Sequence, residues 1–273
     1  MFGEDDEDND KLGNTIRPAA CGVLSFHSGT EEAMFIYIQN YAQRNDVDGI
    51  IKAIDQYCYT RHWMMHIGDQ KSLFLEDAIV KTRMSCPGRG EVIVELGSYC
   101  GYSSLRIAKL LSEGGRLYSI EKESQCVDWT MRLLDYAGLL HKVTVIHGCI
   151  DDNDLTLNKL KDLIIHDSHI NPPSIDLLFI DHKKSLYLPD LKHIIASNLL
   201  HSGSIVVADN VLCFDEPLHD YLTYVKEGGL FSSSITMHST LEYSSLPPGM
   251  DSGAGATTSE PFHLDRVEIS VYR

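Results

Sequence analysis

Two short apolar runs of this sequence end in polar residues that together could hold a metal ion. Asp181 directly follows one run, with Lys184 three residues later, and Asp209 and Asn210 directly follow another. Carboxylate and amide oxygens are hard ligands that suit an octahedral Mg²⁺ with positions left open for water or substrate. If the two runs are neighbouring parallel strands, about 5 Å apart, Asp181 and Asp209 can share one cation. Each carboxylate alone could instead cap a strand end or a helix, so the metal site depends on the four residues together.

A lysine beside such a cation could act as a general base, because a nearby divalent charge favours the neutral amine. Lys183 or Lys184 alone would be interpreted as a solvated surface charge, and only the nearby Asp181 selects Lys184. The histidines show no metal-binding spacing.

A second group of residues points to a nucleoside-type cofactor. The run at 92–96 leads into a turn that contains Glu95, Gly97 and Gly101, and the run at 116–120 is followed by Glu121. Gly97 lets the backbone turn tightly against a ligand, and Glu121 could accept hydrogen bonds from both ribose hydroxyls. The turn lacks the Gly-x-Gly-x-x-Gly pattern of nicotinamide enzymes. These residues alone leave the identity of the cofactor open.

The pattern of the chain from residue 91 onward supplies the elements that would bring these residues together. Short β-branched runs alternate with amphipathic stretches, which is typical of parallel strands that are buried on both faces and connected by helices. The expected strands are 92–96, 116–120, 142–147, 175–180, 204–208, 232–243 and 266–272, and the expected helices are 103–111, 124–137, 156–165, 188–200 and 216–226. This order predicts an α/β fold: a doubly wound, mostly parallel seven-stranded sheet with helices on both faces. Ligands of such sheets bind outside the carboxyl ends of the strands, where the polar residues lie.

Extra helices are expected before the sheet. The first opens with Thr30 as its N-cap, and the others cover 47–61 and 71–83. The expected apolar face of the first helix consists of Ala33, Met34, Ile36, Tyr37, Ile38 and Tyr41. Residues 1–29 are acidic with few large apolar groups and are expected to be disordered, which leaves 30–273 as a single domain. The Gly/Ser/Thr/Ala-rich stretch 247–259 is expected to be a mobile loop.

The composition limits the partners and the compartment. The net charge is −16, and the chain remains acidic when its first ten residues are left out, so a nucleic-acid partner is not expected. The seven cysteines are scattered and include no Cys-x-x-Cys, which favours free thiols in a reducing compartment. No apolar run approaches the length of a membrane span, and the acidic N-terminus is unlike a secretory signal. We therefore expect a cytoplasmic protein without a membrane partner.

Taken together, in order and spacing, these segments resemble the catechol O-methyltransferase family, a class of S-adenosylmethionine-dependent, Mg²⁺-dependent O-methyltransferases. The resemblance covers roughly residues 47–245. It is carried by the segments 53–58, 63–69, 94–103, 181–190, 208–211 and 241–243. It implies a Rossmann-like methyltransferase fold for the domain 30–273.

The resemblance implies S-adenosylmethionine as the cofactor. Ile67 would back its methionine part, Glu95 would engage its amino group, and Tyr99 and Ser103 would line its carboxylate end. Glu121 would bind the ribose. The remaining cofactor-binding residues would be Gly97 in the turn, Gly148, Cys149, Ile150, Asp151 and His182 at the adenine, and Asp181.

The resemblance likewise implies Mg²⁺ held by Asp181, Asp209 and Asn210, with Lys184 as the catalytic general base. A small-molecule catechol would receive the methyl group on one hydroxyl, and a monomer is expected. The substrate would be held by Trp63, Lys184, Asn210 and Glu242, with Met65 beside the sulfonium.

Departures from the family pattern leave alternatives open. Lys183 stands where the family has Trp against the adenine, and Phe214 stands where it has Pro in the substrate wall. Insertions around 153–174 and between 243 and 266 are expected to alter only loops. The acceptor could be a bulkier phenolic ester, or the chain could be a non-catalytic scaffold that binds the cofactor. Trp63 and Met65 could also be ordinary core residues, His182 a strand-end histidine, and Glu242 a polar surface residue of a strand.

Overall fold

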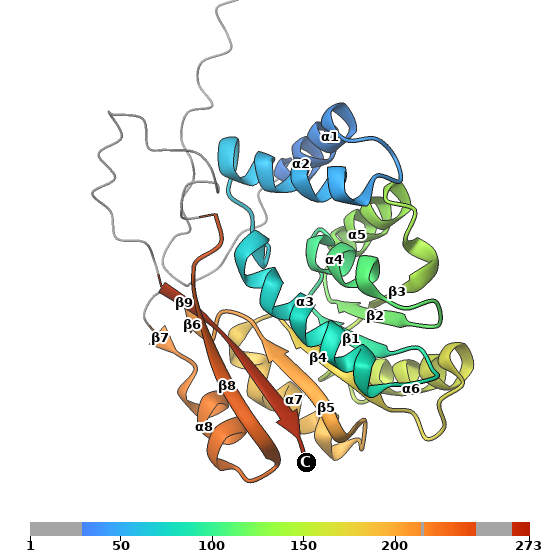
Figure 1. Cartoon of the computed structure of the whole chain (residues 1–273), viewed down its shortest axis with the longest axis vertical. Helices are drawn as coiled ribbons and strands as arrows, with labels where there is room; N and C mark the ends of the chain where they lie inside the picture. Colours follow the sequence, from blue (N-terminus) through green and yellow to red (C-terminus); the bar gives the residue numbers. More distant parts are fainter. Residues whose placement is uncertain (1–28, 214–215, 244–263) are drawn as a thin grey trace, which may run out of the picture.

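A computed structural model describes residues 29–213, 216–243 and 264–273 of the chain, and Figure 1 shows a twisted sheet flanked by helices. The helices are α1 (Thr30–Tyr41), α2 (Val47–Thr60), α3 (Gly68–Ser85), α4 (Tyr102–Leu110), α5 (Ser124–Tyr136), α6 (Leu155–Ser168), α7 (Tyr187–Ala196) and α8 (His219–Glu227), with short 3-10 turns η1 (Leu140–Lys142) and η2 (Lys184–Leu186). The strands are β1 (Val92–Leu96), β2 (Arg116–Glu121), β3 (Val143–His147), β4 (Ile175–Ile180), β5 (Leu200–Ala208), β6 (Leu212–Cys213), β7 (Glu216–Pro217), β8 (Phe231–Thr240) and β9 (Leu264–Tyr272). The predictions for the segment 1–28, Phe214, the loop up to residue 259 and the later insertion lie outside the described residues.

Seven strands form one sheet in the order β3-β2-β1-β4-β5-β9-β8. The first five are parallel, and β9 pairs antiparallel with both β5 and β8. The predicted doubly wound, mostly parallel seven-stranded sheet is confirmed. The strand order reverses between β1 and β4, so the ligand edge expected for this fold lies at the carboxyl ends of these two strands.

Alternation along the strands divides the apolar residues between two cores, because successive side chains of a strand point to opposite faces. In β1, Ile93 packs with α1 to α5, whereas Val92, Val94 and Leu96 pack with α6, α7 and α8. Figure 1 shows α3 and α4 in front of the sheet and α7 behind it. The strand ends are therefore held from both faces.

The first helix differs in part from its prediction. Its N-cap is Gly29, at φ 95°, and not Thr30. Of the apolar face predicted for it, Ile36 and Tyr41 are exposed, whereas Phe35 is buried against Trp129 and Tyr136 of α5. The predicted phase was wrong for these residues because α1 packs on two partners, α2 and α5, which a single periodic stripe does not describe.

Three other boundaries are corrected. The helix predicted at 156–165 is confirmed as α6 but extends to Ser168, so the region of the earlier insertion contains part of a helix as well as loops. The predicted helix 188–200 ends at Ala196, and Leu200 begins β5. The predicted helix 216–226 begins only at His219, because Glu216 and Pro217 pair with β6. In each case strand pairing or helix packing overrides the local pattern.

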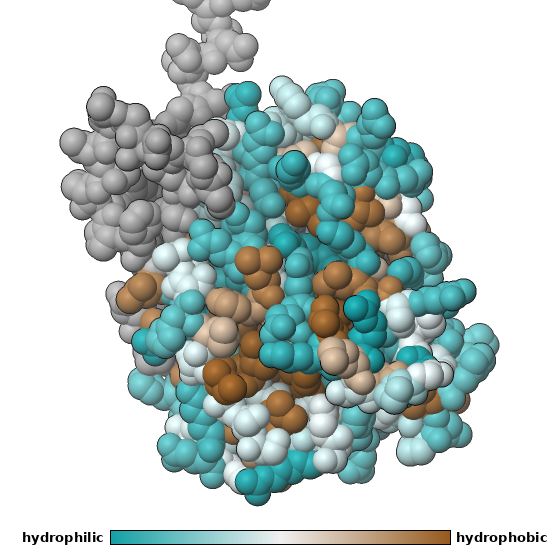
Figure 2. All heavy atoms as spheres, in the orientation of Figure 1, coloured by the Kyte–Doolittle hydropathy of each residue, from teal (hydrophilic) through white to brown (hydrophobic). Residues whose placement is uncertain are grey.

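The face with α3 and β8 is polar overall, and Figure 2 shows apolar side chains gathered in patches between the hydrophilic ones. Exposed apolar residues on these two elements include Leu73, Met84 and Ile235. Among the described residues, no helix is long and apolar enough to cross a membrane. The cysteines at positions 58, 86, 100, 126 and 149 are free thiols, as expected.

Candidate active site at the carboxyl edge of the sheet

The predicted site residues follow strand ends that are held in register by backbone hydrogen bonds. Ile180 of β4 pairs with Ala208 of β5, so Asp181 and Asp209 come next on neighbouring strands. Asp181 N–H donates to the carbonyl of Leu96, and Asp209 N–H donates to that of Ile180, both at 3.0 Å. Parallel pairing thus brings together two carboxylates that are far apart in the sequence.

The turn after β1 lies directly against the end of β4. Gly97 has φ +91°, and a Cβ atom at this position would lie 2.7 Å from the carbonyl oxygen of Asp181. Only glycine fits this combination of backbone angle and close approach. The tight turn predicted at Gly97 is therefore needed because the chain passes close to the end of β4, at the point where the strand order reverses.

Glu95 is fully buried under this turn. One of its carboxylate oxygens accepts hydrogen bonds from Ser104 and Ser119, while the other, Oε1, is buried with no hydrogen-bond partner among the described residues. Burial raises the pKa of Glu95 to about 7. Glu95 Oε1 could therefore accept a hydrogen bond from the amino group of a ligand.

Glu121 ends β2 and organises the same turn. Its Oε2 accepts the backbone N–H groups of Ser98 and Tyr99, both at 3.0 Å, and its Oε1 accepts that of Glu123 at 2.9 Å. A carboxylate oxygen can accept more than one hydrogen bond, so acceptor capacity remains for the hydroxyls of a ribose.

The other predicted cofactor residues lie around this edge with different exposures. Ile67 and Ser103 are buried, and the Tyr99 hydroxyl donates to the buried Glu31 at 2.8 Å. After β3, Ile150 is buried in the second core, whereas Asp151 is exposed and Cys149 is intermediate. A Cβ atom on Gly148 would lie 2.1 Å from Thr156 Oγ1.

His182 lies beside Asp181 in this group. It stacks on Tyr187 and bonds Asp190 at 2.7 Å, and its other ring nitrogen, Nδ1, is buried with no partner among the described residues. The cofactor roles of all these residues stay predictions.

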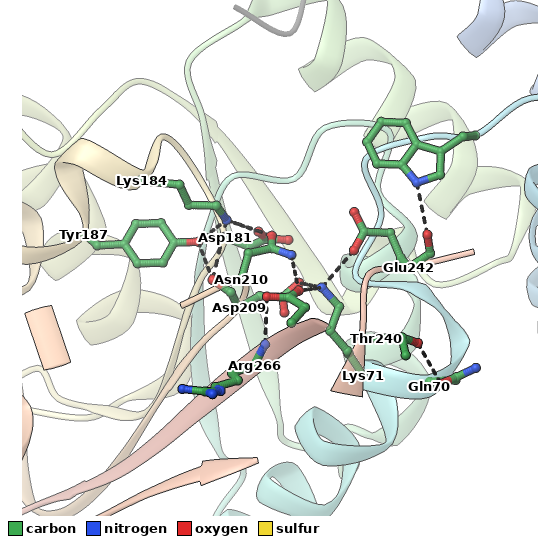
Figure 3. A network of polar contacts seen from close by, with 12 residues as sticks. Gln70, Lys71, Asp181, Lys184, Tyr187, Asp209, Asn210, Thr240, Glu242 and Arg266 are labelled. Carbon is green, nitrogen blue, oxygen red and sulfur yellow. Dashed lines mark hydrogen bonds and ion pairs between the residues drawn. The ribbon is translucent and has the colours of Figure 1, made fainter. Parts of the chain in front are cut away.

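Lys184 connects the two strand ends, as Figure 3 shows. Its Nζ lies 3.3 Å from Asp181 Oδ1 and 2.8 Å from Asn210 Oδ1. It also donates to the hydroxyl oxygen of Tyr187 at 2.6 Å, while that hydroxyl donates its own proton to the Asp209 carbonyl at 3.0 Å. The lysine side chain is 23% exposed and is therefore accessible from solvent. A cationic group thus lies between two of the three predicted metal ligands.

The third predicted ligand, Asp209, faces a second lysine. Lys71 Nζ lies 2.9 Å from Asp209 Oδ2, 2.8 Å from Glu242 Oε2 and 2.6 Å from Asp265 Oδ2, and the lysine side chain is only 1% exposed. Burial alone would lower the pKa of Lys71, but the three carboxylates raise it well above its ordinary value. Lys71 is therefore a fixed internal cation.

Asp209 and its neighbours retain acceptor capacity that a metal could use. Asp209 Oδ1 is buried with no hydrogen-bond partner among the described residues. Burial is the largest cause that raises the pKa values of Asp181, Asp209 and Glu242. Within residues 29–213, 216–243 and 264–273, no three His, Cys, Asp or Glu side chains are grouped to hold a metal. The predicted set contains only two carboxylates and would be completed by the amide of Asn210, so these donors fit Mg²⁺.

The predicted substrate residues Trp63 and Glu242 are in direct contact. The indole N–H of Trp63 donates to the Glu242 carbonyl at 3.0 Å, although 179 positions separate the two residues. Both are buried, so Glu242 is not an ordinary surface residue of a strand. Met65 is only half-buried, and it follows the fully buried Met64.

Three residues of this site were missed by the sequence reasoning: Lys71, Tyr187 and Asp265. Lys71 carried a usable signal, because it shares the buried stripe of α3 with Leu75 and Ile79, where a lysine needs a charged partner. Tyr187 lies three residues after Lys184, a helical spacing that places both on one face. Asp265 gave no local signal, since its buried position depends on the pairing of β9 with β8.

The chain resembles known methyltransferases in sequence and in fold. The O-methyltransferase family model matches residues 46–226. Catechol O-methyltransferase B of Danio rerio is 34% identical over 214 residues, 78% of this chain and 74% of that protein. Catechol O-methyltransferase of Mus musculus is 34% identical over 225 residues, 82% of this chain and 78% of that protein.

The likeness extends to solved structures. The O-methyltransferase TomG of Streptomyces achromogenes, solved in complex with S-adenosylmethionine, matches with a TM-score of 0.57 at 16% identity, covering 88% of this chain and 96% of that one. At this identity the match shows a shared fold. Together with the family match, it leads to one conclusion: this chain belongs to the O-methyltransferase family.

Proposed function

We propose that this protein transfers a methyl group from S-adenosylmethionine to one hydroxyl of a catechol, in a Mg²⁺-dependent reaction with Lys184 as the general base. The named activities of the relatives from Danio rerio and Mus musculus support the catechol, and the cofactor of the TomG structure supports the methyl donor. The observation that carries the proposal is the position of Lys184 between Asp181 and Asn210, together with a carboxylate oxygen of Asp209 that has no hydrogen-bond partner among the described residues.

The turn after β1 would hold the cofactor. Bound S-adenosylmethionine would supply a methyl group activated by its positively charged sulfur. The buried Oε1 of Glu95 suits its amino group, and Glu121 suits the ribose hydroxyls. Since Glu121 also fixes the backbone of Ser98 and Tyr99, ribose binding and the shape of the turn are linked.

Asp181, Asp209 and Asn210 would hold the metal. Bound Mg²⁺ would lower the pKa of a catechol hydroxyl and fix its orientation. Glu242 would accept a hydrogen bond from the hydroxyl that is not methylated, and the Trp63 indole, fixed by the Glu242 carbonyl, would lie against the ring. Holding both reactants in this way can contribute about 7–11 kcal/mol in favourable cases.

Lys184 is the group suited to accept the proton of the reacting hydroxyl. The Tyr187 hydroxyl donates its hydrogen bond to the Asp209 carbonyl, so its oxygen can only accept one from Lys184. Lys71 cannot take this part, because it is buried and surrounded by three carboxylates.

Lys184→Ala tests this assignment. We expect it to lose most of the turnover of a simple catechol while still binding the cofactor, because positioned general-base catalysis typically contributes about 10²–10⁴-fold. The matched control is Lys192→Ala, an exposed lysine of α7 away from the strand ends. Turnover is measured by methylated product and binding by calorimetry. Full activity of Lys184→Ala in the presence of Mg²⁺ contradicts the assignment.

The same assay separates the alternatives. A panel that pairs small catechols with bulky phenolic esters identifies the class of acceptor by the ratio of kcat/KM values. A non-catalytic scaffold would bind the cofactor in the calorimeter and yield no product from any diphenol in the panel.

A further inference from the structure

Asp265 contacts both the internal cation and a predicted metal ligand. Its Oδ2 accepts Lys71 Nζ and the Asn210 amide nitrogen Nδ2, each at 2.6 Å, and its Oδ1 accepts the backbone N–H of Arg266 at 2.7 Å. The Asp265 side chain is fully buried. The Asp265 carboxylate is therefore shielded from solvent, and its hydrogen bonds go to groups of the protein itself.

These contacts determine which atoms of its neighbours remain free. Because the Asn210 amide nitrogen points to Asp265, the Asn210 oxygen Oδ1 is turned the other way, toward Lys184. Because Lys71 binds Asp209 Oδ2, the unpartnered oxygen of that carboxylate is Oδ1. Figure 3 shows Lys71 and Lys184 on opposite sides of Asp209 and Asn210. Asn210 thus presents its oxygen toward Lys184, and Asp209 keeps one carboxylate oxygen that no described residue binds.

The charges of the cluster agree with this arrangement. Asp181, Asp209, Glu242 and Asp265 contribute four formal negative charges, and Lys71 and Lys184 contribute two positive ones. The formal sum is two negative charges, an excess that favours a bound cation. A buried carboxylate such as Asp265 is tolerable only when paired, and Lys71 provides that pairing.

We propose that Asp265, held by Lys71, is a positioning residue that fixes the Asn210 amide so that its oxygen, and not its nitrogen, faces a divalent cation. This inference rests on the metal site of the proposed function. Groups that orient metal ligands typically change metal affinity by about 10–100-fold when they are replaced.

An exchange of the two side chains tests the proposal without any assay of activity. Asn210→Asp removes the amide donor and sets two carboxylates against each other, which cannot both stay ionised at such close range. If Asp265 acted through charge alone, the added carboxylate would tighten cation binding. Positioning by Asp265 predicts the opposite, a Kd for Mn²⁺ raised about tenfold. The double variant Asn210→Asp, Asp265→Asn restores one amide and one carboxylate, and its Kd should return to within about threefold of wild type.

The measurement is a Mn²⁺ titration of each folded variant, followed by the electron paramagnetic resonance signal of free Mn²⁺. Thermal melts check folding, and Asn210→Asp alone remains decisive if the double variant does not fold. Binding by Asn210→Asp as tight as wild type, or a folded double variant as weak as Asn210→Asp, overturns the proposal. Absence of Mn²⁺ binding to the wild-type protein instead overturns the metal site of the proposed function itself.

Discussion

Two lysines a few ångströms from the same aspartate have different environments. Lys71 is 1% exposed and surrounded by three carboxylates, whereas Lys184 is 23% exposed and donates to neutral oxygens as well as to Asp181. A permanently charged lysine can hold other groups in place, but only an accessible one that loses its proton can act as a base. The division of roles at this site follows from burial and not from residue type.

Glu95→Gln is expected to change how the stability of the protein depends on pH. Burial raises the pKa of Glu95 from 4.5 to about 7. An acid with a higher pKa in the folded than in the unfolded chain retains its proton on folding, so the free energy of unfolding falls as pH rises from about 4.5 to 7. The contribution is on the order of 3 kcal/mol. The free energy of unfolding of Glu95→Gln should not decrease in this way, so the stability of the variant relative to wild type should rise between pH 5 and 8.

Urea denaturation of the cofactor-free protein at several pH values checks this prediction. Parallel stability curves of wild type and Glu95→Gln over this range would show that Glu95 is ionised in the folded state. Weaker cofactor binding by the variant is expected in calorimetry, since its amide lacks the negative charge suited to an amino group.

At the scale of elements, the sequence predicted strands better than the contacts between them. The strands β1 and β4 have the predicted bounds, because continuous β-branched runs between turn residues are a strong local signal. The proximity of Asp181, Asp209 and Asn210 followed from parallel strand ends. Lys71 and Asp265 could not be placed in this way, because their contacts join α3 and β9, which are far apart in the chain and meet only through packing. The phase of α1 was missed for the same reason.

Gly97 and Gly203 provide a matched pair for the turn after β1. Both have positive φ, +91° and +96°, but a Cβ atom on Gly97 would meet the Asp181 carbonyl, whereas one on Gly203 would meet nothing within 4 Å. Gly203→Ala should cost about 1–2 kcal/mol for its backbone angle alone. Gly97→Ala should cost about 1–3 kcal/mol more, because the crowded strand end must shift. It should also weaken cofactor binding.

The stability losses are measured from the denaturation midpoints of the two variants, and their cofactor affinity is measured by calorimetry. Equal losses of stability, with unchanged cofactor affinity in Gly97→Ala, would contradict the close approach of the turn to β4.

In the whole molecule, the candidate active site lies at one end of the sheet, and a cluster of charged residues that stabilises the fold lies at the other. Asp176, near the start of β4, accepts hydrogen bonds from Arg89, from the Val92 N–H and from His201. Its side chain is 1% exposed. Burial alone would raise the pKa of Asp176, but these bonds hold it well below its ordinary value. Four residues of β4, 177–180, separate this cluster from Asp181, so the fold can be stabilised at one end without constraint on the other.

Asp176→Asn should therefore reduce stability and leave catalysis unchanged. A carboxylate with a depressed pKa stabilises the fold above its unfolded value, here 3.8, and this contribution is lost as pH falls toward the folded value. We expect a loss of about 3 kcal/mol at pH 7 that becomes smaller below pH 4. Denaturation curves and steady-state kinetics of the same preparation measure both effects. A changed kcat without a change in stability would contradict the separation of the two ends.

The central claim is that the carboxyl edge of the sheet carries out metal-assisted methyl transfer to a catechol. The most direct test incubates the wild-type protein with S-adenosylmethionine and a mixture of diphenols, with Mg²⁺ or with excess chelator. Metal-assisted transfer predicts a singly methylated product from 1,2-diphenols with Mg²⁺, and loss of that product in the chelator. Undiminished methylation in the chelator, or equal methylation of diphenols whose hydroxyls are not adjacent, would contradict it.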